Sequence, residues 1–300
     1  MTTTIPFKRD MEFTYGKMDQ LSPLIRRVIA HNPSPFTFYG TGTYILGEGN
    51  VMVIDPGPAD EQHINNLLEG LSGETISHIL VTHTHLDHSP GCRLLQQHCD
   101  AKTYAFGPHG SGKHEKGETV EQGADFEFTP DVLLRDQQII EGEGYQVECV
   151  HTPGHTSNHM CFQLVQEKAL FTGDHVMGWS TSVISPPDGD MAAYMESLNR
   201  LLERNDSVYW PTHGPCITDT KSFVKSFIAH REERERQILK ALQKGKTRIA
   251  EMVPEMYQDI PEQLYPAAAR SVLASLIYLI DKEKVVRPES IALDTRFEPV

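Results

Sequence analysis

Three histidines and one aspartate lie within six positions of this 300-residue chain. They are His83, His85, Asp87 and His88, and they directly follow the apolar run at residues 79–81. Because such a run predicts a buried strand, we expect the four side chains to emerge together where that strand ends. Neutral imidazole nitrogens and carboxylate oxygens are ligands of zinc-like ions, and a catalytic site adds water to them. The spacing therefore predicts a catalytic metal site.

Three later segments repeat this arrangement, because each places a histidine or an aspartate in a turn directly after an apolar strand. The side chains are His155, Asp174 and His213. Partners of the right chemical type argue against the simpler interpretation of residues 83–88 as scattered surface histidines. Asp55 also ends a predicted strand, and it is either an ordinary turn residue or a carboxylate that orients a neighbouring ligand loop.

The elements around these residues predict two similar halves. Alternating apolar residues predict a β-hairpin in residues 36–55. Apolar residues at helical spacing predict a helix in residues 60–71, and residues 76–81 are predicted to form the next strand. Short β segments then dominate residues 132–171, before a helix at residues 191–202. This order is typical of an α/β chain in which each half is a sheet with helices outside.

A polar, glycine-rich stretch at residues 107–125 predicts a long exposed loop. Loops of this length often form the lid or a wall of a site. The two histidines in this stretch, His109 and His114, are interpreted as solvent-exposed.

The pattern changes at residue 218, where a long charged helix is predicted to run to about residue 242. Two more helices, at residues 247–256 and 267–279, and a short β element at residues 285–288 follow. Three helices and a wing are the outline of a winged-helix module. We therefore predict a catalytic domain at residues 1–217 and a second domain at residues 218–300.

The helix at residues 267–279 has the place of a DNA recognition helix, but it contains one cation, Arg270. Helices that read a DNA groove carry several basic or amide side chains. The C-terminal part is therefore predicted to be a packing module. This apolar helix could cover its own core, or it could form a homodimer with a second chain.

The formal net charge of −14 is unevenly spread. Residues 1–218 contain 13 Lys and Arg against 28 Asp and Glu, a balance of −15, whereas residues 219–300 contain 14 against 13, a balance of +1. A nucleic-acid partner requires a basic surface, which the metal-bearing part lacks. Nucleic acid is therefore disfavoured as a partner.

The remaining composition indicates an ordinary cytoplasmic chain. The first ten residues lack the apolar core of a signal peptide, and no stretch approaches the roughly 18 apolar residues of a membrane span. No membrane partner is expected. The five cysteines are odd in number and form no Cys-x-x-Cys pair, which argues against a disulfide framework.

The four ligand-bearing segments, taken in order, resemble the metallo-β-lactamase superfamily over the first 215 or so residues. The resemblance implies an α+β fold in which two similar halves form a four-layer αββα sandwich, followed here by a small winged-helix-like domain. It also implies two metal positions that share one bridging residue. These positions are His83, His85 and His155 for one ion, Asp87, His88 and His213 for the second, and Asp174 between them.

The same resemblance implies two divalent ions per chain, with zinc as the first choice and manganese or iron as alternatives. Two ions about 3.5–4 Å apart lower the pKa of a shared water, so that a hydroxide exists at neutral pH, and they stabilise the oxyanion that its attack creates. Asp87 is assigned the catalytic role of positioning that hydroxide. His175, which follows Asp174, is a candidate for supporting the ligands or facing the substrate.

Nearly the whole chain resembles lactamase-β-like hydrolases that end in a winged helix, through residues 32–44, the turns at His155, Asp174 and His213, and the segment at residues 228–235. Such relatives include animal mitochondrial endoribonucleases and fungal thioesterases that act on carrier proteins. Asp174 stands where the best-known zinc β-lactamases have cysteine, which argues against antibiotic resistance. Gly42 stands where relatives usually have asparagine.

The preferred prediction is a dinuclear metal-dependent hydrolase that acts on a small acyl compound with an ester-like bond, a thioester or a lactone. One alternative is an endoribonuclease, in which cations of the helix at residues 218–242 guide single-stranded RNA. Another is a mononuclear iron enzyme like the persulfide dioxygenases, which requires an empty second metal position. A catalytically silent scaffold is disfavoured because all seven ligands are present.

Overall fold

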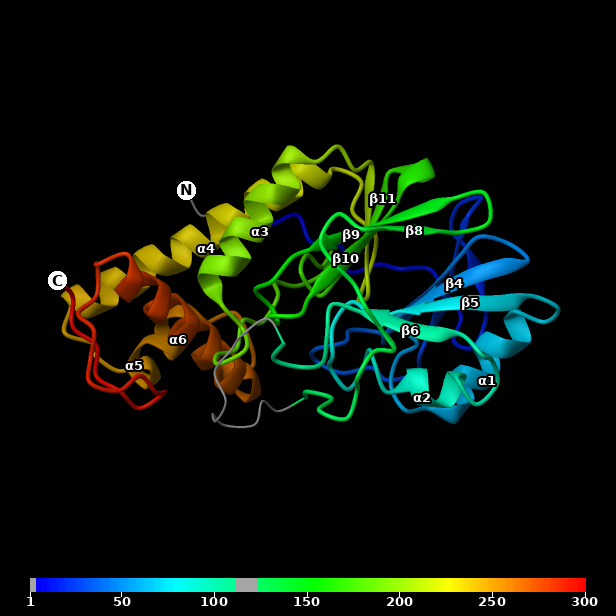
Figure 1. Ribbon diagram of the computed structural model, residues 1–300. Helices are drawn as coiled ribbons and strands as arrows, with labels where there is room; N and C mark the ends of the chain where they lie inside the picture. Colours follow the sequence, from blue (N-terminus) through cyan, green and yellow to red (C-terminus); the bar gives the residue numbers. More distant parts are fainter. Residues whose placement is uncertain (1–3, 112–122) are drawn as a thin grey trace.

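Two β-sheets lie face to face in the computed structural model, which describes residues 4–111 and 123–300 (Figure 1). Helices cover the outer face of each sheet. The strand order is β1-β2-β3-β4-β5-β6-β7 in the first sheet and β12-β11-β10-β9-β8 in the second. The predicted four-layer αββα sandwich is confirmed.

The first sheet mixes antiparallel and parallel pairs. Strands β1 to β4 pair antiparallel, whereas β4 to β7 pair in parallel. Helices α1 (Glu61–Gly70) and α2 (Gly91–Leu95) connect parallel neighbours, and Asp60 caps α1 by accepting a hydrogen bond from the backbone of Gln62. The strands are β1 (Asp19–Gln20), β2 (Ile25–Ile29), β3 (Gly42–Leu46), β4 (Asn50–Ile54), β5 (Thr75–Leu80), β6 (Lys102–Ala105) and β7 (Val132–Leu133).

The second sheet is antiparallel from β8 to β11. Its last strand, β12, pairs with β11 in parallel, and helix α3 (Met191–Glu203) lies between them in the chain. The strands are β8 (Ile139–Glu141), β9 (Gln146–His151), β10 (Met160–Leu164), β11 (Ala169–Gly173) and β12 (Val208–Pro211), with a 3-10 turn η1 (Val165–Glu167) after β10.

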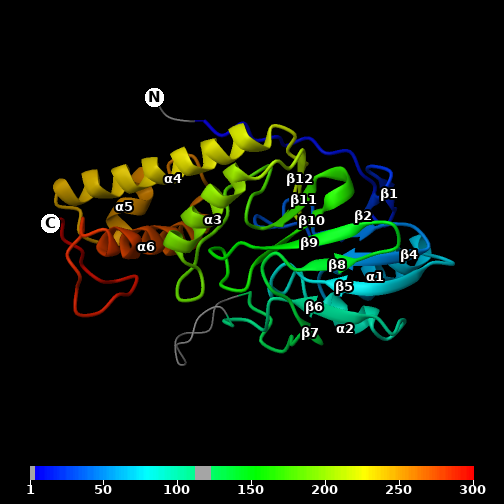
Figure 2. The ribbon, with the colours of Figure 1, turned by 45° about the horizontal axis from the view of Figure 1, so that its top comes forward.

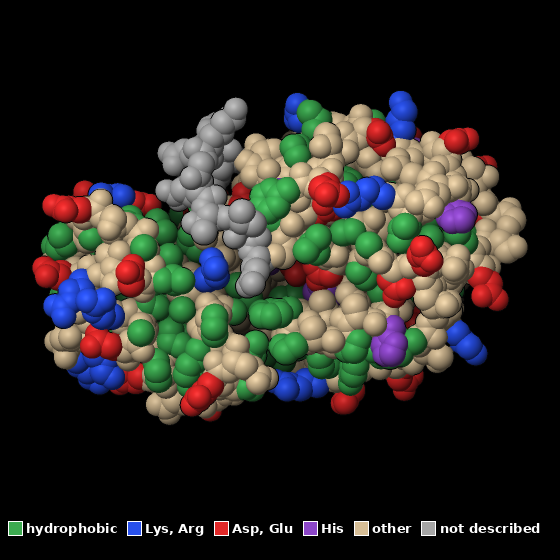
Figure 3. Space-filling view, turned by 90° about the horizontal axis from the view of Figure 1, so that it is seen from below, with side chains coloured by type: hydrophobic (Ala, Val, Ile, Leu, Met, Phe, Trp, Pro, Cys, Tyr) green, Lys and Arg blue, Asp and Glu red, His purple; other side chains and the backbone are tan. Residues whose placement is uncertain are grey.

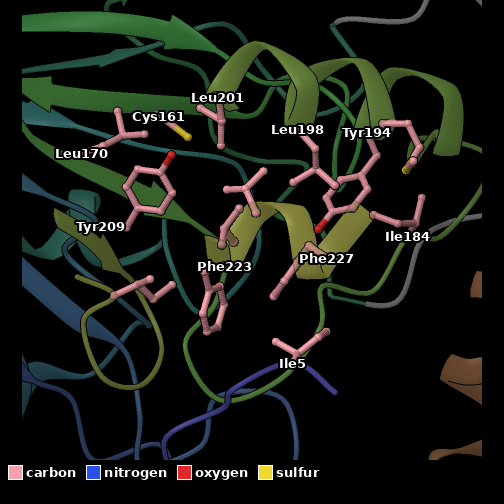
Figure 4. Close-up of a cluster of buried hydrophobic side chains, with 14 of the residues drawn as sticks. Ile5, Cys161, Leu170, Ile184, Tyr194, Leu198, Leu201, Tyr209, Phe223 and Phe227 are labelled. Carbon is pink, nitrogen blue, oxygen red and sulfur yellow. The ribbon is translucent and has the colours of Figure 1, made fainter. Parts of the chain in front are cut away.

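Alternation along the strands divides the core into layers. In β3, Tyr44 and Leu46 face the second sheet, whereas Ile45 faces α1 and α2. This is the period of two that a pleated strand imposes. A third apolar layer lies between the second sheet and the helices α3 and α4, where Tyr194, Leu198 and Phe227 pack together (Figure 4).

The C-terminal part contains the three predicted helices, α4 (Thr220–Gln243), α5 (Ile249–Met256) and α6 (Tyr265–Asp281), with a 3-10 turn η2 (Glu262–Leu264) before α6. Helix α4 runs along the sandwich beside α3 and continues past it to α5 and α6 (Figure 2). In place of the predicted β element, Val285 makes one isolated bridge, to Pro299. The domain boundary at residues 217 and 218 stays a prediction.

Strand β2 was not predicted from the sequence, because Arg26 and Arg27 interrupt its apolar pattern. The fold gives both arginines an ion-pair partner: Arg26 lies 2.5 Å from Glu74, and Arg27 lies 3.3 Å from Asp19. Within the predicted hairpin, residues 36–41 form a turn instead of a strand, and Phe38 has a positive φ of 58°.

Within the described ranges, the segment Glu262–Asp281 is long and apolar enough to cross a membrane by length and hydropathy. The expectation that no stretch approaches this length is therefore wrong. The core helix of a globular protein passes the same test, and 44% of the most apolar window is buried here. Leu276 and Leu279 of this segment pack in the apolar cluster that α4, α5 and α6 form together.

The packing predicts that α4 is part of the sandwich and not a detachable linker. Phe227 is fully buried, so Phe227→Ala should lower the free energy of unfolding by about 3–5 kcal/mol. Phe36→Ala is the matched control, because Phe36 is exposed, and its effect should stay within about 0.5 kcal/mol. Denaturant unfolding monitored by circular dichroism measures both, and a Phe227→Ala protein as stable as the control would contradict this packing.

Candidate metal centre

The seven side chains predicted to bind metal lie together where strands of both sheets end. Four follow β5 in one loop, and the other three follow β9, β11 and β12. They are His83, His85, Asp87 and His88 from the first sheet, and His155, Asp174 and His213 from the second. Figure 3 shows acidic and histidine side chains in a recess near the middle of the molecule, with hydrophobic side chains around it.

Six of the seven side chains form two adjoining groups of three, and a third group, His83, His88 and Asp174, overlaps both. In the first group, His85 Nδ1 lies 3.0 Å from His83 Nε2 and 3.1 Å from His155 Nε2. In the second group, Asp87 Oδ2 lies 3.2 Å from His213 Nε2 and 3.7 Å from His88 Nε2. Ligand atoms about 2.1 Å from a tetrahedral ion lie about 3.4 Å from one another. Each group thus has the spacing of an ion's ligands.

Asp174 lies between the two groups. Its Oδ1 is 3.6 Å from His88 Nε2 and 3.4 Å from His213 Nε2, both in the second group. Its Oδ2 is 3.8 Å from His155 Nε2, in the first group. One carboxylate therefore presents one oxygen to each group, which is the arrangement of a bridging ligand.

Hydrogen bonds at the outer nitrogens fix how the imidazoles face the centre. His155 Nδ1 donates to the Val183 carbonyl at 2.6 Å, and His213 Nδ1 donates to the Gly40 carbonyl at 3.2 Å. Because a carbonyl only accepts, each Nδ1 carries the proton and each Nε2 keeps its lone pair. That lone pair points toward the centre, as a metal ligand requires.

Asp55 fixes the orientation of ligand side chains on the first sheet in the same way. The Asp55 carboxylate is fully buried and accepts hydrogen bonds from His88 Nδ1, Thr212 Oγ1 and both the backbone N–H and the hydroxyl of Thr82. Since the Thr82 hydroxyl donates to Asp55, it accepts from His83 Nδ1, which lies 3.1 Å away. Of the two interpretations of Asp55, the structure favours the carboxylate that orients ligand loops.

The electrostatics of the second group favour a positive charge. Burial alone would lower the pKa of His88, but Asp87, Asp55 and Asp174 outweigh it and raise the pKa to about 10. Burial would raise the pKa of Asp87, yet His88 and His213 lower it well below its usual range. Among the described residues, three buried atoms here make no hydrogen bond: His88 Nε2, His213 Nε2 and Asp174 Oδ1. A cation would satisfy all three, so these residues fit a metal.

Two further buried histidines, His159 and His175, lie next to the seven predicted ligands. His159 Nε2 accepts the backbone N–H of Asp174 at 3.2 Å, and a side chain at Gly173 would meet that nitrogen. His175 is fully buried against Tyr194, and burial first, then His155 and Arg231, lowers its pKa to about 3. A substrate or supporting role for His175 stays a prediction.

His109 corrects the sequence-based interpretation of the loop at residues 107–125. Its side chain is only 5% exposed, its Nδ1 lies 3.1 Å from Thr84 Oγ1, and its ring lies 6.2 Å from that of His85. Exposure was inferred from polar neighbours in sequence, whereas the fold packs His109 beside the ligand loop. His114 lies outside the described residues.

Comparisons with known families agree with this geometry. Residues 37–213 match the family described as the metallo-beta-lactamase superfamily. Residues 249–293 match the beta-lactamase associated winged helix domain.

Curated relatives match over most of their own length. The lactamase-like protein adaB of Aspergillus niger is 32% identical, over 90% of this chain and 84% of that protein. The atrochrysone carboxyl ACP thioesterase of Claviceps purpurea is 33% identical, over 83% and 74%. The beta-lactamase-like protein 2 homolog of Caenorhabditis elegans is 32% identical, over 85% and 83%.

Solved structures share the fold from end to end. A beta-lactamase domain protein from Burkholderia ambifaria has a TM-score of 0.78 at 18% identity, covering 97% of this chain and 96% of its own. A metallo-beta-lactamase family protein from Thermus thermophilus has a TM-score of 0.76 at 20% identity, covering 94% and 100%. At these identities the likeness shows the fold alone.

Asp55→Asn tests how the second group is oriented. An amide leaves one acceptor oxygen where the carboxylate meets four donors, so His88 should lose its fixed orientation. We expect zinc affinity to fall about 10–100-fold, measured by competition with a chromophoric chelator. Asp60→Asn is the matched control, since asparagine caps α1 equally well and should leave affinity unchanged. Equal affinities in the two variants would contradict the role of Asp55.

Proposed function

The chain belongs to the metallo-beta-lactamase superfamily and is a hydrolase of that superfamily, and from this premise we propose that it uses two divalent ions, zinc in the first place, to hydrolyse an ester-like bond. The observation that carries the proposal is the position of Asp174, which offers one carboxylate oxygen to each ligand group. A mononuclear enzyme has no need of the intact second group formed by Asp87, His88 and His213.

The ions would supply a hydroxide nucleophile at neutral pH and would stabilise the oxyanion that forms on the substrate. His83, His85 and His155 would hold one ion, and Asp87, His88 and His213 the other. With this machinery, no side-chain nucleophile is required.

Asp87 is the residue we assign to positioning the attacking water. Its side chain is 28% exposed, whereas those of His88 and His213 are fully buried. The carboxylate therefore faces the open side of the centre as well as the second group. Because the pKa of Asp87 is held low, the carboxylate stays ionised and accepts a hydrogen bond from water.

An apolar rim supports an acyl substrate. Leu86 and Phe126 are 53% and 57% exposed, and Phe126 packs edge-on against His109, beside the ligand loop. On the side of His213, Phe36 is also exposed, in the loop whose Gly40 carbonyl holds that histidine. Apolar side chains around a polar centre suit a substrate with an apolar acyl group next to a carbonyl.

Among ester-like bonds we favour the thioester, with the lactone as the second choice. Several relatives at about a third identity are named as acyl carrier protein thioesterases. RNA is disfavoured, because the part of the chain that holds the centre has a net charge of −15. The cytoplasmic location and the homodimer stay predictions.

A screen of the zinc-loaded protein over acyl thioesters, lactones, a β-lactam and single-stranded RNA tests the proposal. We expect thioester hydrolysis that His85→Ala lowers more than about 100-fold, since it removes a ligand of one ion. His98→Ala is the matched control. It replaces a histidine that is exposed on the surface, so the variant should keep full activity.

Two results would contradict the proposal. One is thioester hydrolysis that persists in His85→Ala. The other is oxygen uptake by a protein that holds one iron, which is the behaviour of the mononuclear alternative. RNA cleavage that falls steeply with salt would replace the proposed substrate by the endoribonuclease alternative.

A further inference from the structure

We propose that Arg231 of helix α4 is a positioning residue for the ligand His155, and that it acts through the backbone of residues 182–184. The inference rests on the proposed metal centre and extends it to the C-terminal helices. It assigns these helices a part in holding a ligand, which neither the ligand motifs nor the family match describes.

The segment between β11 and α3 contacts the ligands directly. The Val183 carbonyl accepts the hydrogen bond from His155 Nδ1 at 2.6 Å. The neighbouring Ser182 hydroxyl lies 2.5 Å from the Asp174 carbonyl and 2.9 Å from the His175 carbonyl, and it shares its one proton between them. A shift of this segment would therefore turn the imidazole of His155 and loosen the backbone at the bridging Asp174.

Arg231 holds the same segment from the opposite side. Its Nη2 donates to the Ser182 carbonyl at 2.5 Å, one peptide unit before the carbonyl that fixes His155. The guanidinium also lies over the ring of Tyr194, 5.0 Å from its centroid, and the Tyr194 hydroxyl donates to the His175 carbonyl. In Figure 4, Tyr194 and Ile184 lie together beside Phe227 of α4.

The burial of Arg231 indicates that its contact with the Ser182 carbonyl is more than surface packing. The residue is 4% exposed, and among the described residues it makes no ion pair with a carboxylate within 4.0 Å. A buried cation without a counter-ion is costly, so the carbonyl and the aromatic face are what stabilise it there. Simple packing of α4 would be served by an apolar side chain.

Helix α6 contributes a weaker contact to the same place. The Ile184 N–H donates to Ser271 Oγ at 3.4 Å, and Ile184 packs in one cluster with Ala274 of α6. Residues 182–184 are thus held between the C-terminal helices and the ligands. The C-terminal part is then a component of the metal centre, which agrees with the prediction that it is a packing module.

Arg231→Met and Arg231→Lys test this inference, with Arg234→Met as the matched control. Arg234 lies on the same helix, but its partners, Gln237, the Met256 carbonyl and the ring of Tyr257, are in the C-terminal part. We expect Arg231→Met to weaken the binding of one of two zinc ions about 10-fold in chelator competition, and to change the visible spectrum of the cobalt-loaded protein. Arg231→Lys, which keeps a donor, should lose less, and Arg234→Met should bind both ions like the wild type.

A double-mutant cycle separates positioning from stability. Because Arg231 acts mainly through His155, Arg231→Met should lose most of its effect on zinc affinity in a His155→Ala background. A full additional 10-fold loss in that background, or equal affinities in Arg231→Met and Arg234→Met, would overturn the inference. If Arg231→Met does not fold, Arg231→Lys takes its place in the cycle.

The outcomes also distinguish the two proposals. A wild-type protein that binds no zinc would remove the proposed function itself. A wild-type protein that binds two ions, with an Arg231 variant indistinguishable from the Arg234 variant, would remove only the role of Arg231.

Discussion

The carboxylate of Asp55 is a buried charge on which the rest of the centre depends. Burying an ionised carboxylate is costly unless hydrogen bonds compensate for the lost water. Here four donors do so, and they belong to the loops that carry the proposed ligands: Thr82 precedes His83, His88 is itself one of these ligands, and Thr212 precedes His213. Satisfying this one charge therefore draws the ligand loops of both sheets to one point.

The layered fold makes that convergence achievable. Each ligand follows a strand, so the ligands occupy the ends of strands while the apolar faces of those strands are buried between the sheets and under the helices. Side chains placed this way lie on loops that the ends of regular strands hold in position. The exception is His155, whose orientation depends on the segment that α4 and α6 hold in place.

The sequence predicts the local part of this account well and the long-range part less well. The motif at residues 83–88 is readable because four ligand-type side chains fall within six positions of the chain. The layered order is readable because β4, β5 and the helix α1 between them have clear periods. Strand β2 was not predicted because Arg26 and Arg27 break the alternation of apolar residues. Their partners Glu74 and Asp19 are known only from the fold. No sequence pattern marks the proposed role of Arg231, since this residue contacts a backbone carbonyl about fifty residues away.

The central claim is that two ligand groups share Asp174 and hold two ions. Metal analysis of the purified protein, saturated with zinc and freed of loosely bound ions, measures this most directly. The account predicts two zinc ions per chain. A protein that holds one ion, or none, would contradict it.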